Sequence, residues 1–516
     1  MPPMNMTWPW SSRVCATSGT KPDQKAWVRA RARALVSIAL LALLLNNSNL
    51  FVVASGRTIQ AGEDIQTAIS SAGAGDIIIV GPGDHGNFDV DRPLTIVGQG
   101  GPMLHAGIQM PAIKVNSDGV TISGFRVQGV GKDTNAKFNY YMQNPLAAAG
   151  QRLDEPNAAI IVRGNDFRLE NSALFGSQVG VLAENVNNLL LQNTTMDGCD
   201  TGVSLTGCIA SKVEGCKIST CKKYAIDIEQ SRDIVLDNNS IVNNTNGGIL
   251  LKATDGCTVQ DNVFSTNTFG LSLWNASHNQ LMRNRADHNY YGFLVTSSSN
   301  YNNITDNSAL DNTRSEIVKG FGIGFSLQEN CSYNIMIRNT AKRNFNGLEV
   351  SRGCQFNVVY GNNASENSHG IRLNENRNNL VFGNNFFNND INAYENTSLN
   401  VWNTTIGNYY SDYRGLDMNG DGIGDKPYSL PGPESKSFDY RPLIRPNRGG
   451  DLGFAALRDA VRKYATFGPA PEEIPLTRKV MGVTVISSHA SGLPPKWPES
   501  RPFDVTIPPF QKEPDF

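Results

Sequence analysis

Glycines recur through the middle of this 516-residue chain at a nearly fixed spacing of 22 or 23 residues. Most precede a short apolar segment, as in Gly180-Val-Leu and Gly248-Ile-Leu-Leu, and one longer step separates Gly292 from Gly324. The repeat positions are Gly180, Gly202, Ala225, Gly248, Gly270, Gly292, Gly324, Gly347 and Gly370. A fixed period of this size indicates stacked repeats that contact only their neighbours, rather than one globular core.

Asparagines keep the same period at two further positions. The first comprises Asn193, Asn238, Asn262, Asn284, Asn307, Asn339, Asn362 and Asn384, with Cys216 in place of Asn once. The second comprises Asn244, Asn267, Asn289, Asn312, Asn344, Asn367 and Asn389, with Cys199 and Cys221 in the first two repeats. Asn tolerates left-handed backbone, and identical Asn side chains on adjacent rungs can bond into ladders, so we expect corners here.

Between these corners, apolar residues alternate with polar ones, which places alternate side chains on one face of a strand. Each repeat therefore reads as three short strands. We predict an all-β fold, a right-handed parallel β-helix with three sheets around a narrow core, with its regular repeats at residues 180–389. One inward column is expected at Val181, Val203, Ile226, Ile249, Leu271, Phe293, Phe325, Leu348 and Ile371.

The N-terminal region, residues 1–55, carries a targeting pattern. Arg29, Arg31 and Arg33 precede the apolar run 34–45, and small residues follow up to Ser55. This order is typical of a secretory signal, with an uncleaved anchor as the alternative; the run is short for a membrane span. We expect a secreted, periplasmic or cell-surface protein whose mature chain has no membrane span. The formal net charge of −2 implies no general attraction to nucleic acid.

After the signal, residues 64–72 predict a short helix with Ile65, Ala68, Ile69 and Ala72 on one face. Strands are expected at 77–80, 94–97 and 120–122. The helix would cap the first rung, which otherwise exposes apolar side chains and unpaired strand edges.

Both ends of the repeat region resemble a known family. The motifs that carry the resemblance are Ile65–Ile69, Gly75–Val80, Pro93–Ile96, Gly407–Tyr413, Asp417–Asp425 and Asp439–Ile444. In this order they are similar to NosD-like and related carbohydrate-binding and sugar-hydrolysis (CASH) β-helix proteins. The resemblance implies one β-helix domain over residues 56–446. The family includes periplasmic accessory proteins for copper insertion into nitrous oxide reductase, so it implies copper, that reductase and an ABC transporter as partners.

The loop 417–425 resembles a calcium-binding loop, because acidic and amide side chains alternate around a tight turn at Gly422. The predicted ligands are the side chains of Asp417, Asn419, Asp421 and Asp425 and the carbonyl of Ile423. Tyr428 stands where an EF-hand loop has Glu, so a polar turn without an ion is the alternative. We expect structural calcium.

Two cysteine pairs occupy equivalent positions on neighbouring repeats, Cys199 with Cys221 and Cys331 with Cys354. Rungs about 4.8 Å apart are compatible with disulfide bonds. Buried thiols are the alternative.

Two insertions and a tail interrupt the pattern. Residues 132–156 carry Phe138, Tyr140 and Tyr141, a candidate ligand-binding loop, and the second insertion lies near 312–319. Residues 447–516 form a C-terminal region with a predicted amphipathic helix at 451–464 and a proline-rich end, which either covers the solenoid or links onward. Leu452, Ala456, Ala460 and Tyr464 would line one side of that helix.

The side chains favour binding over catalysis. No His-x-His or Met-rich cluster suits copper, so copper rests on the resemblance alone. Asp227 with Glu229, and Glu349 with Arg372, are outward candidates, but sugar hydrolysis needs two converging carboxylates. We predict an exported protein that binds a polysaccharide, a surface polymer or a surface protein along flat outer faces. The alternatives are a NosD-like accessory protein and a polysaccharide lyase, epimerase or hydrolase.

Overall fold

The computed structural model describes residues 56–62, 64–106, 110–129, 157–313, 321–396, 399–448, 453–464, 477–480 and 483–486. The expected signal region and the loop with Phe138, Tyr140 and Tyr141 lie outside these residues. Most of the second insertion, at 314–320, also lies outside them.

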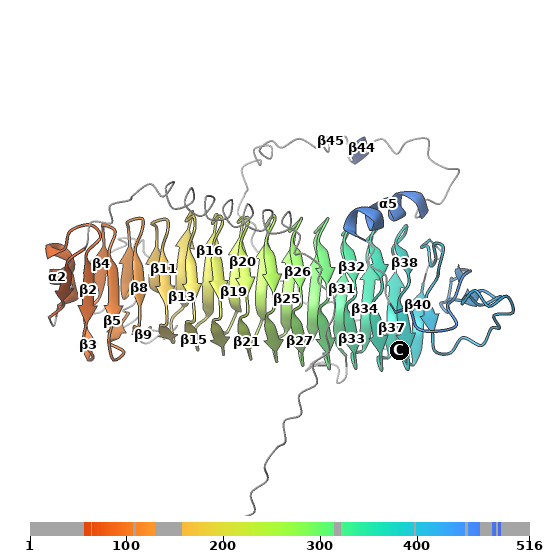
Figure 1. The fold of residues 1–516 in the computed structure, drawn as a ribbon, viewed down its shortest axis with the longest axis horizontal. Coiled ribbons are helices and arrows are strands. Elements are labelled where there is room, and N and C mark those ends of the chain that lie inside the picture. Colours follow the sequence, from red (N-terminus) through yellow and green to blue (C-terminus); the bar gives the residue numbers. More distant parts are fainter. Residues whose placement is uncertain are drawn as a thin grey trace, which may run out of the picture.

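Three long parallel sheets wind into an elongated solenoid (Figure 1). Sheet A has 14 strands: β1 (Thr58–Gln60), β2 (Ile77–Val80), β5 (Thr95–Gly98), β8 (Thr121–Ser123), β11 (Arg168–Glu170), β14 (Leu190–Gln192), β17 (Lys212–Glu214), β20 (Val235–Asp237), β23 (Thr258–Gln260), β26 (Gln280–Met282), β29 (Asn303–Thr305), β32 (Ile335–Ile337), β35 (Val358–Tyr360) and β38 (Leu380–Phe382). Sheet B has 14 strands: β3 (Asp84–His85), β6 (Met103–His105), β9 (Arg126–Gln128), β12 (Ala173–Phe175), β15 (Thr195–Asp197), β18 (Lys217–Ser219), β21 (Ser240–Val242), β24 (Val263–Ser265), β27 (Arg285–Asp287), β30 (Ser308–Leu310), β33 (Thr340–Lys342), β36 (Asn363–Ser365), β39 (Asn385–Phe387) and β41 (Tyr409–Tyr410).

Sheet C has 13 strands: β4 (Phe88–Val90), β7 (Ile113–Val115), β10 (Ala158–Val162), β13 (Val179–Glu184), β16 (Thr201–Thr206), β19 (Tyr224–Glu229), β22 (Gly247–Lys252), β25 (Phe269–Trp274), β28 (Tyr291–Thr296), β31 (Ile323–Leu327), β34 (Asn346–Ser351), β37 (His369–Asn374) and β40 (Ile391–Glu395). Two antiparallel hairpins follow, β42 (Tyr428–Ser429) with β43 (Phe438–Asp439), and β44 (Thr477–Val480) with β45 (Val483–Ile486). The predicted three-sided parallel β-helix is confirmed.

The predicted inward column lies in sheet C, and its members are successive Cα partners from Val181 to Ile371. Every member is at most 1% exposed. The rings of Phe293 and Phe325 stack with their centroids 4.7 Å apart. The predicted register is therefore confirmed, and the narrow core forms from inward apolar side chains that stack on neighbouring rungs, two of them on a strand such as β22, where Ile249 and Leu251 are buried.

Asparagine ladders run along all three corners of the solenoid. The A–B ladder comprises Asn239, Asn262, Asn284, Asn307, Asn339, Asn362, Asn384 and Asn408. At each step one Asn donates its backbone N–H and its Nδ2 to Oδ1 of the next rung; from Asn284 to Asn307 these distances are 2.9 and 3.0 Å. At each corner the chain leaves one sheet before it enters the next, and the ladder supplies hydrogen-bond partners for the buried backbone N–H groups there.

For two rungs the prediction placed the ladder residue one position too early in the sequence. Asn193 and Asn238 are exposed and have φ of 49° and 53°, whereas Thr194 and Asn239 are the buried residues that follow them. Each corner contains an exposed left-handed residue followed by a buried one. Asn suits both positions for different reasons, so the sequence did not separate them.

The B–C ladder confirms the second predicted column, and the third ladder was not predicted. The B–C ladder runs from Asn244 to Asn389. The C–A ladder comprises Asn279, Asn302, Asn334, Asn357, Asn379 and Asn400. A cysteine N–H donates to the first Asn of each ladder, from Cys216, Cys221 and Cys257, each at 2.9 Å.

Each ladder ends at a carboxylate. Asn408 N–H donates to Asp439 Oδ2 (2.7 Å), and Asn400 Nδ2 donates to Glu395 Oε1 (2.8 Å). Asn389 Nδ2 donates to Asn392 Oδ1 (3.1 Å), whose own Nδ2 donates to Asp412 Oδ1 (2.7 Å). The N–H donors of every ladder point toward the C-terminal end, so the last rung needs acceptors, which these carboxylates supply.

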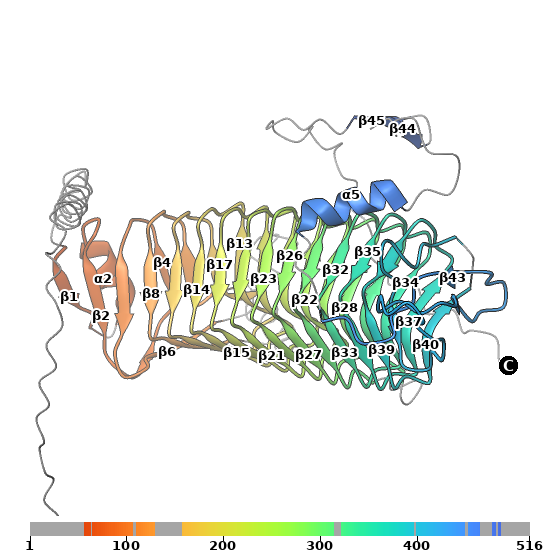
Figure 2. The ribbon, with the colours of Figure 1, turned by 45° about the vertical axis from the view of Figure 1, so that its right-hand side comes forward.

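Helices cover one end and one side of the solenoid (Figure 2). α2 (Ile65–Ser71) packs on the first rungs, Asp64 caps its N-terminus, and the predicted apolar face is confirmed because Ile65, Ala68, Ile69 and Ala72 are buried. Within the described ranges, neither helix has the length and apolar character that crossing a membrane requires.

α5 (Phe454–Tyr464) lies on the outer face of sheet A beside β32, β35 and β38, so it covers the solenoid. Leu457 is fully buried there, with Phe454 and Ala460 packed beside it. The predicted helix is confirmed; on its predicted apolar side Ala460 packs against sheet A, but Ala456 is exposed. Only about one helical turn is buried, too little for the pattern to define the contacting face.

Candidate functional site

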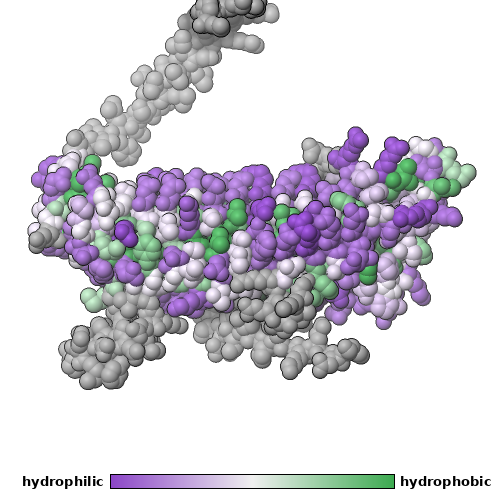
Figure 3. Space-filling model, turned by 90° about the horizontal axis from the view of Figure 1, so that it is seen from below, coloured by the Kyte–Doolittle hydropathy of each residue, from purple (hydrophilic) through white to green (hydrophobic). Residues whose placement is uncertain are grey.

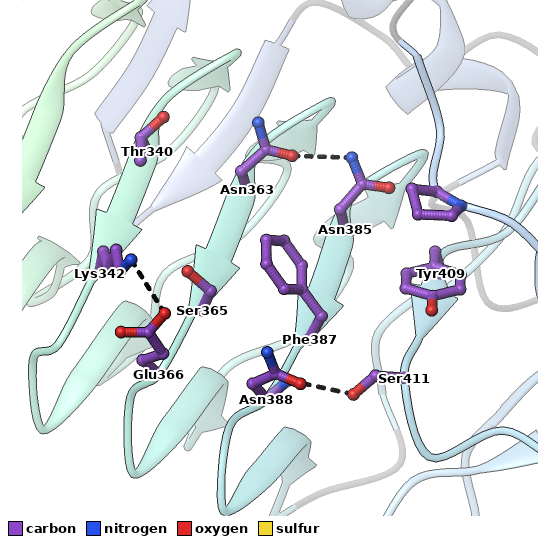
Figure 4. Close-up of a pocket in the computed structure, with 11 residues that line it drawn as sticks. Thr340, Lys342, Asn363, Ser365, Glu366, Asn385, Phe387, Asn388, Tyr409 and Ser411 are labelled. Carbon is purple, nitrogen blue, oxygen red and sulfur yellow. Dashed lines mark hydrogen bonds and ion pairs between the residues drawn. The ribbon is translucent and has the colours of Figure 1, made fainter.

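A groove of about 590 Å³ lies on the outer face of sheet B near its C-terminal end (Figure 4). Strands β33, β36, β39 and β41 form it, and Pro446 closes one side. Its lining residues are Thr340, Lys342, Asn363, Ser365, Glu366, Asn385, Phe387, Asn388, Tyr409, Ser411 and Pro446. Each rung places its outward side chains directly beside those of the next, so residues 22 or more positions apart line one surface.

Hydrogen bonds fix the polar side chains of the groove. Lys342 Nζ pairs with Glu366 Oε1 at 2.9 Å, and Asn385 Nδ2 donates to Asn363 Oδ1 at 2.7 Å. The wall is held because Asn447 N–H donates to Asn385 Oδ1 at 2.7 Å. The half-buried rings of Phe387 and Tyr409 lie among these polar groups (Figure 4). A preformed hollow with polar groups and two rings suits a ligand rich in hydroxyl groups.

A row of half-buried rings follows the corner between sheets B and C. Ring centroids are 6.0 Å apart between Tyr290 and Phe321, 4.6 Å between Phe321 and Phe345, and 5.7 Å between Phe345 and His369. Tyr290 also contacts Tyr291 at 4.8 Å. We call these five residues the ring row. Elsewhere, the face seen in Figure 3 is mostly hydrophilic, with hydrophobic residues in small patches.

The outward acids of sheet C lie where the sequence predicted. Glu349 is the Cα partner of Arg372 on the next rung, and Asp227 lies between Ser204 and Leu250. Glu349 is 8% exposed and accepts hydrogen bonds from Asn346 Nδ2 (2.5 Å) and Ser351 Oγ (3.3 Å); burial raises its pKa.

Asp227 and Glu229 do not form a matched catalytic pair. Burial and the neighbouring Glu229 raise the pKa of Asp227 to about 6. Glu229 itself pairs with Lys252 at 2.9 Å. This pairing with Lys252 occupies Glu229, so the half-buried Asp227 has no second free carboxylate beside it on β19.

The predicted calcium loop closes on its own backbone. Asp417 accepts three amide hydrogen bonds, from Gly420, Asp421 and Gly422 at 2.8, 3.1 and 2.9 Å. Asp421 and Asp425 likewise accept from Ile423 and Met418, and Asn419 from Asp421. Among the described residues no group of three or more His, Cys, Asp or Glu side chains is placed to hold a metal. These hydrogen bonds hold the backbone of the loop, and calcium binding stays a prediction.

The side chains that could bind copper do not come together within the described part of the chain. The seven described cysteines are buried free thiols, and burial raises the pKa of Cys199, Cys216 and Cys257 to about 11, which disfavours the thiolate. Met336 lies in the core. His278 bonds to Asp255 at 2.7 Å. The described residues therefore do not fit a copper site.

The two cysteine pairs are also free thiols in the structure, and their oxidation stays a prediction. Cys331 is hydrogen-bonded with Cys354, which, together with burial, raises its pKa. Cys199 and Cys221 are both buried at the corner between sheets B and C.

A family model described as periplasmic copper-binding protein (NosD) matches residues 143–320 and 315–415, more than half of the chain. The chain belongs to the NosD family. The family match covers most of the regular rungs and continues through β41 up to the start of the loop with Asp417. No curated protein matches this NosD-family chain.

Solved structures share the fold of this NosD-family protein at low sequence identity. The A-module of mannuronan C-5 epimerase AlgE6 from Azotobacter vinelandii is 12% identical, with a TM-score of 0.47, over 67% of this chain and 93% of that one. The Dettilon tailspike protein is 12% identical, with a TM-score of 0.46, over 57% and 61%. The periplasmic alginate epimerase AlgG is 14% identical, with a TM-score of 0.35, over 62% and 84%. These likenesses concern the fold alone.

Sequence reasoning missed the groove and the ring row of this NosD-family protein. A signal for the ring row was present, because an aromatic residue directly follows two ladder asparagines, in Asn289-Tyr290 and Asn344-Phe345. The groove has no such periodic signal, since it depends on Pro446 and Asn447 returning to sheet B.

Proposed function

We propose that this protein is a periplasmic accessory protein for copper insertion into nitrous oxide reductase, and that it acts as a docking scaffold. The family match over residues 143–320 and 315–415 carries the proposal. The described residues do not fit a copper site, so the proposed contribution is to hold a partner, the reductase or its ABC transporter, against an outer face. The mostly polar surface in Figure 3 suits a partner that binds and releases.

The test uses a bacterium that makes nitrous oxide reductase and carries the gene for this protein. Deleting the gene should lower the copper content of the purified reductase, and the wild-type gene should restore it. A His278→Ala variant should restore it equally, because that side chain is paired with Asp255 and holds no copper. The separately purified mature protein should take no stoichiometric copper(I) from a competing chelator. Unchanged copper in the deletion strain would refute the accessory role, and stoichiometric copper would refute the scaffold reading.

A second candidate function is saccharide binding in the groove of sheet B, supported by the two rings among fixed polar groups. Losing one ring contact costs about 0.5–1.5 kcal/mol, or roughly 2- to 13-fold in affinity. Phe387→Ala and Tyr409→Ala should each weaken a ligand found on a glycan array by this factor. Tyr301→Ala, at a ring outside the groove that is 37% exposed, is the matched control. Array binding that neither groove variant alters would rule out this site.

A further inference from the structure

The outer face of sheet C carries a second cluster of polar groups, away from the groove, on β34 and β37. The strand register pairs Asn346 with His369 and Glu349 with Arg372, so four chemically distinct side chains meet on two adjacent rungs. Sheet C lies around the corner from sheet B, so this cluster is a different surface from the groove of Figure 4.

Two buried polar atoms of this cluster have no partner among the described residues. Asn346 is 0% exposed; its Nδ2 donates to Glu349, but its Oδ1 accepts no hydrogen bond. Nδ1 of His369 is likewise buried and unpaired. An unmade buried hydrogen bond costs about 1–3 kcal/mol, so such atoms in a native protein call for an explanation. Both atoms are closed to solvent, so a ligand that carries hydroxyl groups would satisfy them only after a neighbouring side chain moves aside.

The charge of the cluster points to an acidic ligand. Arg372 forms no ion pair within the described part of the chain, and its guanidinium lies 5.9 Å from the ring centroid of Tyr394. Arg352, on the strand end of β34, adds a second positive charge, although it lies near Glu329 at 3.6 Å. Burial raises the pKa of Glu349, and the nearby positive charge of Arg372 opposes that shift. Arginine binds carboxylates through two parallel hydrogen bonds.

The ring row leads into this cluster at His369. Successive rungs are about 4.8 Å apart, close to the length of one pyranose unit, so neighbouring rings can face neighbouring sugars. Tyr290, Phe345 and His369 are each half-buried and present part of a ring to solvent. An acidic polymer aligned with the solenoid axis would meet apolar ring faces first and then Arg372.

We propose that the outer face of sheet C at β34 and β37 binds an acidic saccharide of the uronate class. Arg372 pairs with a uronate carboxylate. A neighbouring side chain moves aside, and Asn346 Oδ1 then accepts a hydrogen bond from a hydroxyl group of the sugar. The rings of Phe345 and Tyr290 stack on the sugar faces. The site stands independently of both proposed functions above, since neither uses these residues.

The test is calorimetric titration of the mature protein with oligogalacturonate and oligomannuronate, with a neutral oligosaccharide of equal length as the comparison ligand. At least one uronate should bind, more weakly as salt rises, and the neutral sugar should bind at least tenfold more weakly. Arg372→Gln should weaken uronate binding by roughly 10- to 100-fold without changing the affinity for the neutral sugar. Phe345→Ala should weaken both by a similar, smaller factor.

Three controls keep the proposal refutable. Arg283→Gln removes a surface arginine that pairs with Asp261, and it should leave uronate binding unchanged. Arg372→Lys keeps the charge and loses the paired geometry, so it should retain intermediate affinity even if Arg372→Gln does not fold. Phe387→Ala tests the groove and should have no effect. The proposal is overturned if neither uronate binds, if the neutral sugar binds equally, or if Phe387→Ala and not Arg372→Gln abolishes binding.

Discussion

Replacing Asn239 by alanine tests the A–B ladder against its immediate neighbour in the chain. Asn239 is 2% exposed; its Oδ1 accepts from Cys216 N–H (2.9 Å), and its Nδ2 donates to Val213 O and Asn262 Oδ1 (both 2.9 Å). Alanine would leave the buried Cys216 N–H without an acceptor and would remove both Nδ2 bonds. An unpaired buried donor costs about 1–3 kcal/mol, and each other bond about 0.5–1.5 kcal/mol. We expect a loss of about 2–6 kcal/mol in the free energy of unfolding.

Asn238 is the matched control, one residue earlier. It is exposed and left-handed with φ of 53°, and glycine adopts this backbone without strain, so Asn238→Gly should change stability by less than about 0.5 kcal/mol.

Urea unfolding gives the global comparison, and hydrogen exchange gives the local one. Solenoid repeats open locally, so the exchange rate of the Cys216 amide reports on this one corner. That rate should rise in Asn239→Ala and stay unchanged in Asn238→Gly. Equal destabilisation by the two variants, or an unchanged Cys216 amide in Asn239→Ala, would refute the ladder as the source of stability.

Three further predictions concern the core and the C-terminal end. Ile249→Asp buries an unpaired charge in the inward column and should lower stability by several kcal/mol, whereas Ile249→Val should cost about 0.5–1.5 kcal/mol; an unchanged melting temperature for Ile249→Asp would contradict the register. Burial raises the pKa of Asp439 from 3.8 to about 6, so the folded protein binds this proton more tightly than the unfolded chain does. The resulting contribution to the free energy of unfolding is fully present below about pH 4. It is lost as pH rises through 6, by up to ~3 kcal/mol. Asp439→Asn should flatten that part of the pH profile of the melting temperature, and a profile equal to wild type would count against the assignment. Asp421→Ala and a calcium chelator should each lower the melting temperature and expose residues after Asn408 to protease. Asp417→Ala removes the carboxylate that accepts from three amide N–H groups, so it should do so with or without calcium. Calorimetry that finds no heat of calcium binding would reduce the loop to a polar turn.

The inward column was fully predictable because two independent regularities fix it. The repeat glycine marks the strand of sheet C, and period-two alternation then assigns Val181 or Ile249 to the core. The A–B corner lacked such a double constraint. At Asn238 and Asn239 the residue type is the same and only the hydrogen bonds differ, so the sequence pattern favoured the wrong one.

The candidate sites depend on contacts that no local pattern records. Lys342 meets Glu366 across one rung, and Asn385 meets Asn447 across 62 residues of chain. The unpaired oxygen of Asn346 is visible only when all its neighbours are placed.

The three ladders give the solenoid a direction, and this limits how such a chain can change in length. A duplicated interior rung brings, at each corner, one Asn that accepts through Oδ1 and donates through its backbone N–H and Nδ2. It therefore joins the ladders without altering its neighbours. A duplication that includes Glu395, Asp412 or Asp439 would instead place a carboxylate in the middle of a ladder, where it accepts from one side and has nothing to donate to the other. Whole-repeat gain or loss is thus confined to the rungs between the starting cysteines and the acidic end, and the terminal segment must be inherited as one piece.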